Sequence, residues 1–240
     1  MAAIRKMIPF YLAILFLAAG GALLASRSVS VLADAFTIPT SSPLPTVVVD
    51  AGHGGEDGGA AAPNGTKESV LNLEISLRVR DALRFLGLPV VMVRENDVSV
   101  CDPEAATVSE KKVSDLKNRV RLVGETPNAI LLSIHQNMFS ESQYHGAQVF
   151  YAGASGSREM AECMQELLRT ALDPANHRQS KQANTVYLLN KIHCPGILVE
   201  CGFLSNPEEE ALLETADYQK KLAAAIAAGL IQAWKTAAVY

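Results

Sequence analysis

Short apolar runs rich in β-branched residues alternate with longer segments of helical periodicity from residue 46 onward. The short runs predict five strands: Thr46–Asp50, Val90–Arg94, Ala129–Ile134, Ala147–Tyr151 and Gly196–Glu200. They are apolar throughout rather than alternating, so we expect helices to cover both faces of the sheet. The pattern therefore predicts an α/β fold, a single domain around a mixed, mainly parallel central sheet.

Four segments have the periodicity of amphipathic helices. The first runs from Glu68 to Leu86 before Gly87, and we expect its buried side to carry Val70, Leu73, Leu77, Leu83 and Phe85. Apolar positions between residues 113 and 123 and between 160 and 171 mark two more, and residues 218–234 form the last. Segments 96–108 and 173–184 lack periodicity, so we predict loops around a site there.

The N-terminal segment has a different character. Residues 8–25 carry no charge and follow Arg5 and Lys6, which is the layout of an export signal or a short membrane anchor. We interpret residues 1–35 as that signal or anchor, residues 36–45 as a linker rich in Pro, Ser and Thr, and residues 46–240 as the folded domain. The domain is thereby predicted to lie outside the cytoplasm.

Composition narrows the class of partner. Without residues 1–35 the chain has 18 basic and 24 acidic residues, which argues against nucleic acid as the ligand. The four cysteines show neither a disulfide-scaffold spacing nor a CxxC metal motif. We expect them to be free or buried thiols.

Two histidines occupy equivalent positions along the predicted sheet. His53 follows the strand Thr46–Asp50 within a glycine-rich turn, and His135 follows the strand Ala129–Ile134. Strand ends of an α/β sheet are where such folds place ligands, so the pair favours a shared metal over two unrelated hydrogen-bonded side chains.

Two glutamates stand out beside them. Glu200 ends the apolar run 196–200, where an ionised carboxylate needs a metal, a hydrogen-bond donor or a proton. A raised pKa at this position suits a general base. The alternative is that Glu200 forms an ion pair. Glu68 opens the first long helix, so it is either a third metal ligand returning toward His53 or a glutamate stabilising the helix dipole.

Four motifs in this order carry a family resemblance: Val-Val-Val-Asp-Ala-Gly-His-Gly-Gly (47–55), Lys-Glu-Ser-Val-Leu-Asn-Leu (67–73), Ser-Ile-His-Gln-Asn (133–137) and Val-Glu-Cys-Gly-Phe-Leu-Ser-Asn (199–206). The chain resembles the zinc-dependent N-acetylmuramoyl-L-alanine amidases over residues 46–234. The resemblance implies His53, Glu68 and His135 as Zn²⁺ ligands and Glu200 as the catalytic glutamate. It also implies hydrolysis of the amide between the lactyl group of muramic acid and L-alanine of the peptidoglycan stem.

The stretch from residue 184 to 209 is similar to the germination-specific amidases of the spore cortex. That similarity implies a role on the way to muramic-δ-lactam, with a downstream muramic acid deacetylase, a possible helper lipoprotein and a location between the forespore and mother-cell membranes. The chain departs from the wider family after Arg119, where Val-Arg-Leu-Val-Gly replaces a frequent Ala-Asn pair. The groove wall around Arg119 is therefore expected to differ.

Two other functions use the same residues. A zinc peptidase cutting within the stem peptide needs the same metal set, and a peptidoglycan-binding module without activity keeps the same fold. A buried base at Glu200 argues against the binding module. Among the remaining histidines, His145, His177 and His193 are expected in surface or hydrogen-bonding roles, with His193 as a reserve ligand.

Overall fold

The computed structural model of the protein describes residues 44–237. The predicted signal or anchor, and the linker up to residue 43, lie outside the described residues. Within 44–237, no helix combines the length and apolar character needed to cross a membrane.

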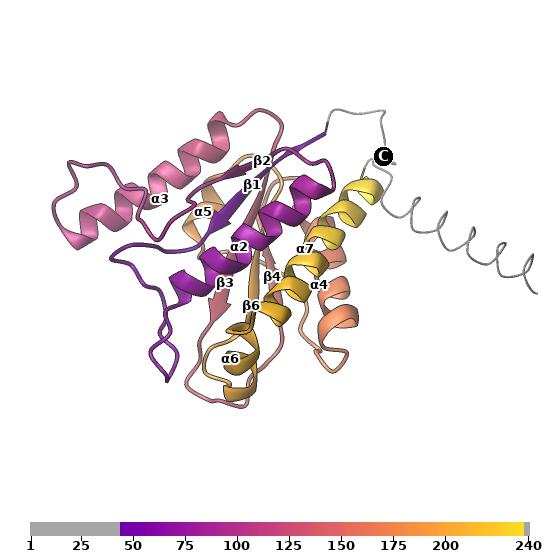
Figure 1. The fold of residues 1–240 in the computed structure, drawn as a ribbon. Helices are drawn as coiled ribbons and strands as arrows, with labels where there is room; N and C mark the ends of the chain where they lie inside the picture. The colour runs from indigo at the N-terminus through magenta and orange to yellow at the C-terminus, as the bar shows by residue number, and fades with distance from the viewer. Residues whose placement is uncertain (1–43, 238–240) are drawn as a thin grey trace, which may run out of the picture. The chain divides into compact units, whose positions relative to one another are not determined.

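A six-stranded sheet forms the centre of the domain, with strand order β2-β1-β3-β6-β4-β5 (Figure 1). Its strands are β1 (Thr46–Ala51), β2 (Val90–Met92), β3 (Ala129–Asn137), β4 (Gln148–Tyr151), β5 (Lys181–Gln182) and β6 (Gly196–Phe203). The first four in this order are parallel, β4 runs antiparallel to β6, and β5 runs parallel to β4. The prediction of a mixed, mainly parallel sheet is confirmed.

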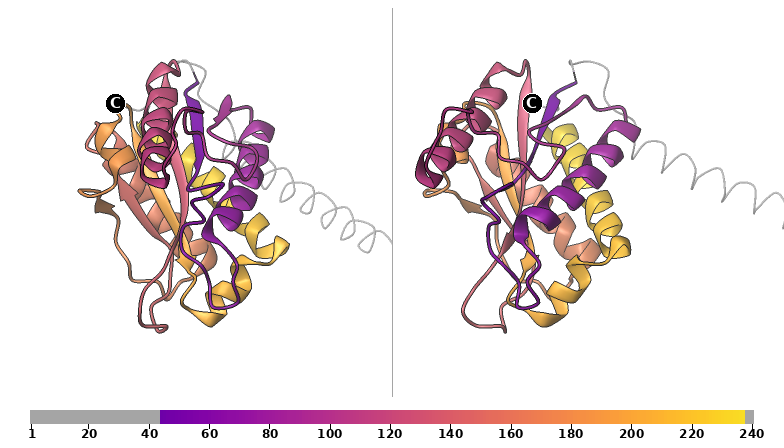
Figure 2. Two further views of the ribbon diagram at one scale, coloured as in Figure 1. Left: turned by 90° about the vertical axis from the view of Figure 1, so that its left-hand side faces the viewer. Right: turned by 60° about the vertical axis from the view of Figure 1, so that its left-hand side comes forward.

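Helices cover both faces of this sheet, as Figures 1 and 2 show. One face carries α2 (Glu68–Phe85), α4 (Ser157–Leu172) and α7 (Ala216–Ala237), and the other carries α3 (Val108–Glu125) and the short α5 (Tyr187–Lys191). The helix α6 (Pro207–Leu213) follows β6 at the lower end of the molecule in Figure 1. Neighbouring residues of the strands, such as Val47 and Val48 or Leu131 and Leu132, are therefore fully buried on opposite faces.

The buried side of α2 differs from the prediction. Of the predicted positions, Leu83 is buried, whereas Phe85 is 91% exposed, Val70 is 37% exposed, and Leu73 and Leu77 are half-buried. The buried apolar stripe comprises Leu71, Ile75, Val79 and Leu83. The segment carries two overlapping sets of apolar positions, and local periodicity does not choose between them. The stripe that turns inward is the one that also carries Glu68 and Asn72, which are both buried at the edge of the sheet.

Two strands extend further than their apolar runs. His135 lies within β3, which continues to Asn137, and Glu200 lies within β6, which continues to Phe203. The parallel ladder pairs His135 with Glu200 and, after a register shift, continues to Asn137 and Phe203. The four cysteines are free thiols, as expected.

Candidate metal centre

The turn after β1 places His53. β1 ends at Ala51, and His53 adopts a left-handed backbone conformation with φ of 60°, an uncommon state for a residue other than glycine. Gly52 lies against the His135 ring, where an added Cβ would be 2.2 Å from ring atoms Cε1 and Nε2. The Gly-His-Gly sequence is thus required by close approach as well as by backbone conformation.

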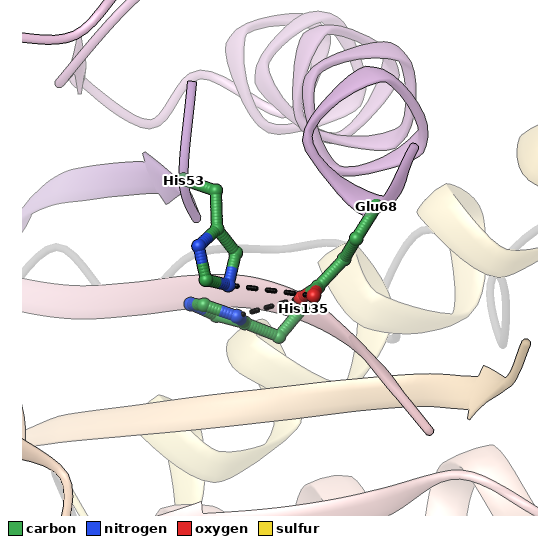
Figure 3. A group of neighbouring side chains, drawn as sticks. All are labelled: His53, Glu68 and His135. Carbon is green, nitrogen blue, oxygen red and sulfur yellow. Dashed lines mark hydrogen bonds and ion pairs between the residues drawn. The ribbon is translucent and has the colours of Figure 1, made fainter. Parts of the chain in front are cut away.

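Glu68, the first residue of α2, directs its carboxylate toward both imidazoles from one side (Figure 3). Its Oε1 is 2.9 Å from His135 Nδ1, and its Oε2 is 3.4 Å from His53 Nε2. The two rings meet edge to face with centroids 5.0 Å apart. Within the described part of the chain, this is the one group of three or more His, Cys, Asp or Glu residues whose ligand atoms lie close enough to hold a metal, all within 4.8 Å of one another.

The carboxylate of Glu68 is fixed by more than the histidines. It accepts hydrogen bonds from the backbone N–H groups of Ala60 and Gln136 and from the side-chain amide of Asn72. Burial by itself raises the pKa of Glu68, but hydrogen bonds and charges from His135 and His53 hold that pKa well below its usual range. Glu68 therefore presents an ionised, oriented carboxylate that could hold a metal, and it does more than stabilise the helix dipole.

Asp57 orients the His53 ring from the side away from Glu68. Its Oδ2 lies 3.0 Å from His53 Nδ1, which leaves Nε2 directed toward Glu68. Burial lowers the pKa of His53, but Glu68 first and then Asp57 outweigh burial and raise it to about 9 in the metal-free protein. A carboxylate on the outer nitrogen of an imidazole is the usual support of a metal-ligating histidine.

Glu200 faces this group from the neighbouring strand. It pairs in register with His135, so the two side chains leave the same face of adjacent parallel strands. Its Oε2 is buried and has no hydrogen-bond partner among the described residues. Burial raises the pKa of Glu200 to about 7; the charge of Glu68 adds to the rise, and the charges of His135 and His53 oppose it.

A cavity of about 200 Å³ opens beside these residues. Its polar wall includes His53, His135 and Glu200, and its apolar wall comes from the segment around α5, including Val186, Leu188 and Leu189. A second cavity of about 420 Å³ lies on the other side of His53, toward the loop 97–101. The site thus has room for a substrate on either side of the candidate metal ligands.

The profile of the family described as N-acetylmuramoyl-L-alanine amidase matches residues 47–232. The chain belongs to this family. Its members are hydrolases, and the chain is accordingly an N-acetylmuramoyl-L-alanine amidase rather than a peptidase or a binding module without activity.

Individual relatives agree with this assignment. The amidase is 37% identical to the germination-specific N-acetylmuramoyl-L-alanine amidase of Bacillus subtilis (strain 168), an alignment that covers 81% of this chain and 82% of the relative. It is 29% identical to the N-acetylmuramoyl-L-alanine amidase AmiA of Escherichia coli (strain K12), over 77% and 74% of the two chains. Among solved structures, the CwlD amidase from Clostridioides difficile, in complex with the GerS lipoprotein, superposes with a TM-score of 0.77 at 38% identity, covering 80% of this chain and 99% of that one.

The remaining histidines of the amidase lie apart from the centre. His145, His177 and His193 are exposed, and the group that could hold a metal contains none of them. His193 therefore does not serve as a reserve ligand in this arrangement. Burial raises the pKa of the thiols of Cys194 and Cys201, which disfavours either as a nucleophile.

The sequence did not single out two residues of the centre's surroundings, Asp57 and Arg94. Arg119, which marks the expected departure from the wider family, is buried, contacts the turn of His53 and also lines the cavity beside Glu200. A signal existed for Arg94, because a charged residue at the end of an apolar strand needs partners, the same reasoning that selected Glu200. Asp57 had no such signal, since it lies in a polar loop.

Proposed function

We propose that this amidase uses a zinc ion held by His53, Glu68 and His135, with Glu200 as the catalytic base. The buried, unpartnered Oε2 of Glu200 beside the three converging side chains carries this proposal. Two imidazole nitrogens and one carboxylate oxygen form a donor set that Zn²⁺ favours in hydrolytic sites, where a further position stays open. The bound zinc supplies a Lewis acid that polarises the amide carbonyl and acidifies water.

The chain's own residues perform the proton transfers. Glu200 accepts the proton of the attacking water on its free oxygen and then delivers it to the nitrogen of the leaving L-alanine. A pKa of about 7 before zinc binds suits a carboxyl group that first accepts a proton and then donates it near neutral pH. The positive charge of the metal favours the ionised, proton-accepting form. His53 donates its Nδ1–H to the carboxylate of Asp57. This hydrogen bond keeps the proton on Nδ1, so that the lone pair of Nε2 is free for the metal.

The substrate in this proposal is the amide between the lactyl group of muramic acid and L-alanine of the peptidoglycan stem. We further propose the spore cortex as the setting, with muramic-δ-lactam as the eventual product and a muramic acid deacetylase as the next enzyme. Similarity to the germination-specific amidase supports this setting. The lipoprotein present in the CwlD structure supports a helper lipoprotein for this chain too.

Export belongs to the same proposal. Peptidoglycan lies outside the cytoplasm, and residues 1–35 have the layout of a signal peptide or membrane anchor. The space between the forespore and mother-cell membranes is the proposed location.

Product analysis tests the reaction. Digestion of purified muropeptides, followed by mass spectrometry, is expected to release intact stem peptides and leave muramic acid with a free lactyl carboxyl. Shortened stems would instead identify a peptidase, and unchanged muropeptides in the presence of zinc would contradict hydrolysis.

A pair of variants tests the two glutamate roles. Glu68→Ala removes a ligand and should weaken zinc binding by several kcal/mol, with partial recovery of activity at high zinc. Glu200→Gln keeps the shape of the side chain but accepts no proton, so it should retain zinc while turnover falls by at least about 10²-fold. Zinc content and turnover of both variants check this; a zinc-free Glu200→Gln protein, or parental zinc affinity in Glu68→Ala, would reverse the assignment.

A further inference from the structure

Two buried arginines bind the backbone of the turn that carries His53. Arg119 donates from Nη1 to the carbonyl of Ala51 at 3.0 Å and from Nη2 to the carbonyl of His53 at 2.7 Å. Arg94 donates from Nε to the carbonyl of Ala51 at 2.9 Å and from Nη2 to the carbonyl of Gly52 at 3.0 Å. Three consecutive carbonyl oxygens are therefore held by two guanidinium groups.

These contacts fall where the backbone is least favourable. His53 has a φ of 60°, and the next residue, Gly54, has a φ of 134°. A residue other than glycine keeps a left-handed conformation when its surroundings fix it there. The guanidinium groups fix the carbonyl on each side of the His53 Cα, and hence the direction in which its imidazole leaves the chain.

The same arginines reach the segments of the other two candidate ligands. Arg94 Nη2 also donates to the carbonyl of Ser69 at 2.8 Å, one residue after Glu68. Arg119 pairs with Asp50, whose Oδ2 accepts from the Ser133 hydroxyl at 2.6 Å, two residues before His135. Through these bonds the turn of His53, the start of α2 and the strand β3 are joined into one network.

Ordinary ion pairing does not account for Arg94. Its side chain is fully buried, and the carboxylate that it faces, Asp97, is 3.9 Å away and 43% exposed. Its close hydrogen bonds go to four backbone carbonyls, the fourth being that of Asn96. A buried cation arranged in this way serves the conformation of the chain around it, because burial without a close carboxylate is otherwise unfavourable.

We propose that Arg94 and Arg119 are positioning residues that pre-organise His53, Glu68 and His135 before the metal binds. The inference rests on the proposed function, in which these three residues are the metal ligands. In this proposal both arginines act through the backbone carbonyls that they bind, and Arg119 acts also through its ion pairs with Asp50 and Asp115. Lysine at either position carries the charge but lacks the planar fork that spans two carbonyl oxygens.

The test compares Arg94→Lys and Arg119→Lys with the matched controls Arg80→Lys and Arg121→Lys in the full-length protein. The controls replace arginines of α2 and α3 that pair with the exposed carboxylates Glu95 and Glu125. Zinc affinity is measured by chelator competition, the ligand field by the visible spectrum of the Co²⁺ form, and global stability by urea unfolding of the metal-free protein. We expect zinc affinity to fall about 10–100-fold in the two test variants, with an altered Co²⁺ spectrum, and to stay at the parent value in the controls.

A second measurement needs no variant. In the metal-free parent, amide hydrogen exchange at Gly52, Gly54 and Gly55 reports whether the turn is already ordered, since these N–H groups donate to Ile134, Asp57 and Asp97. The proposal expects them to be protected before zinc is added. Unprotected amides would overturn it even if the lysine variants failed to fold.

The outcomes separate the inference from the function on which it rests. If the parent binds no zinc, or if His53→Ala binds zinc as tightly as the parent, the metal site itself is wrong. If the parent binds zinc through His53 but folded Arg94→Lys and Arg119→Lys proteins bind it equally well, the positioning role is wrong and the metal site stands.

Discussion

The two glutamates of the candidate metal centre have different environments, which suit them to different roles. Glu68 is ionised and hydrogen-bonded at both oxygens, whereas Glu200, on the strand next to His135, has its Oε2 buried without a hydrogen-bond partner among the described residues. Neighbouring donors lower the pKa of the first, and burial raises the pKa of the second. These environments fit the proposed roles of Glu68 as ligand and Glu200 as base.

Asp57 offers a prediction at this scale. Asp57→Ala removes the partner of His53 Nδ1, so the ring is free to rotate, and zinc affinity should fall about 10–100-fold. The comparison is made at high pH, where proton competition at His53 is absent, because the substitution also lowers the pKa of His53. Chelator competition measures the affinity, and Glu56→Ala, which removes an exposed carboxylate paired with Lys111, serves as the control. Equal affinities in the two variants would contradict a role for Asp57.

The raised pKa of Glu200 predicts how stability depends on pH. In the metal-free protein this carboxyl ionises near pH 7, whereas in the unfolded chain it ionises near 4.5. Between pH 4.5 and 7 this carboxyl is protonated in the folded state and ionised in the unfolded chain. The free energy of unfolding therefore decreases as pH rises from about 4.5 to 7, and the contribution of this group is constant above that range. The effect of this one group is up to about 3 kcal/mol.

Glu200→Gln should remove that dependence. The metal-free variant is expected to be more stable than the parent at pH 8 and equally stable at pH 4.5, as measured by urea unfolding. Glu208→Gln, on the exposed side of α6, controls for the loss of a negative charge. A Glu200→Gln protein that keeps the parent's pH profile would show that another group is responsible.

Among the helices, α2 connects the core to the site. Its inward stripe begins with Glu68 and Asn72 at the metal centre and continues through Ile75, Val79 and Leu83 into the core. The burial of apolar side chains two to four turns further on thus holds Glu68, the proposed ligand, in place. Packing of α2 against the sheet and α7 sets the position of Glu68.

The choice of stripe on α2 is testable. Ile75→Ala leaves a cavity at a fully buried position and should lower the free energy of unfolding by about 2–5 kcal/mol. Leu77→Ala, on the half-buried stripe, should cost clearly less. Urea unfolding of both variants measures the difference, and an equal or larger loss for Leu77→Ala would show that the other stripe packs inward.

For the molecule as a whole, the described domain carries its own core and its own site. Every strand of the sheet begins at Thr46 or later, and the chain entering it is fastened where Asn128 donates to the carbonyl of Leu44 and accepts from the N–H of Thr46. We therefore expect deletion of residues 1–35 to leave a domain that folds and binds zinc. Its thermal unfolding midpoint and zinc stoichiometry should match those of the full-length protein; a shift in either would show that the N-terminal segment contributes to the fold.

The sequence by itself determined the properties that depend on residues close together in the chain. Apolar runs of strand length and helical periodicity predicted the mixed sheet between two layers of helices. The apolar surroundings of Glu200 marked a carboxylate in need of a partner, and the placement of His53 and His135 at strand ends brought them together at one sheet edge. The family motifs added Glu68, which spacing alone did not select.

Tertiary structure alone decided the rest, because those choices depend on partners distant in the sequence. The inward stripe of α2 was fixed by the packing of the helix against the sheet and α7. The support of His53 by Asp57 depends on the conformation of a glycine-rich loop, and its support by Arg94 and Arg119 joins residues about 40 and 66 positions apart. Hydrogen bonds over such separations leave no periodicity in the chain, so they become visible only when the folded backbone brings donors and carbonyls together.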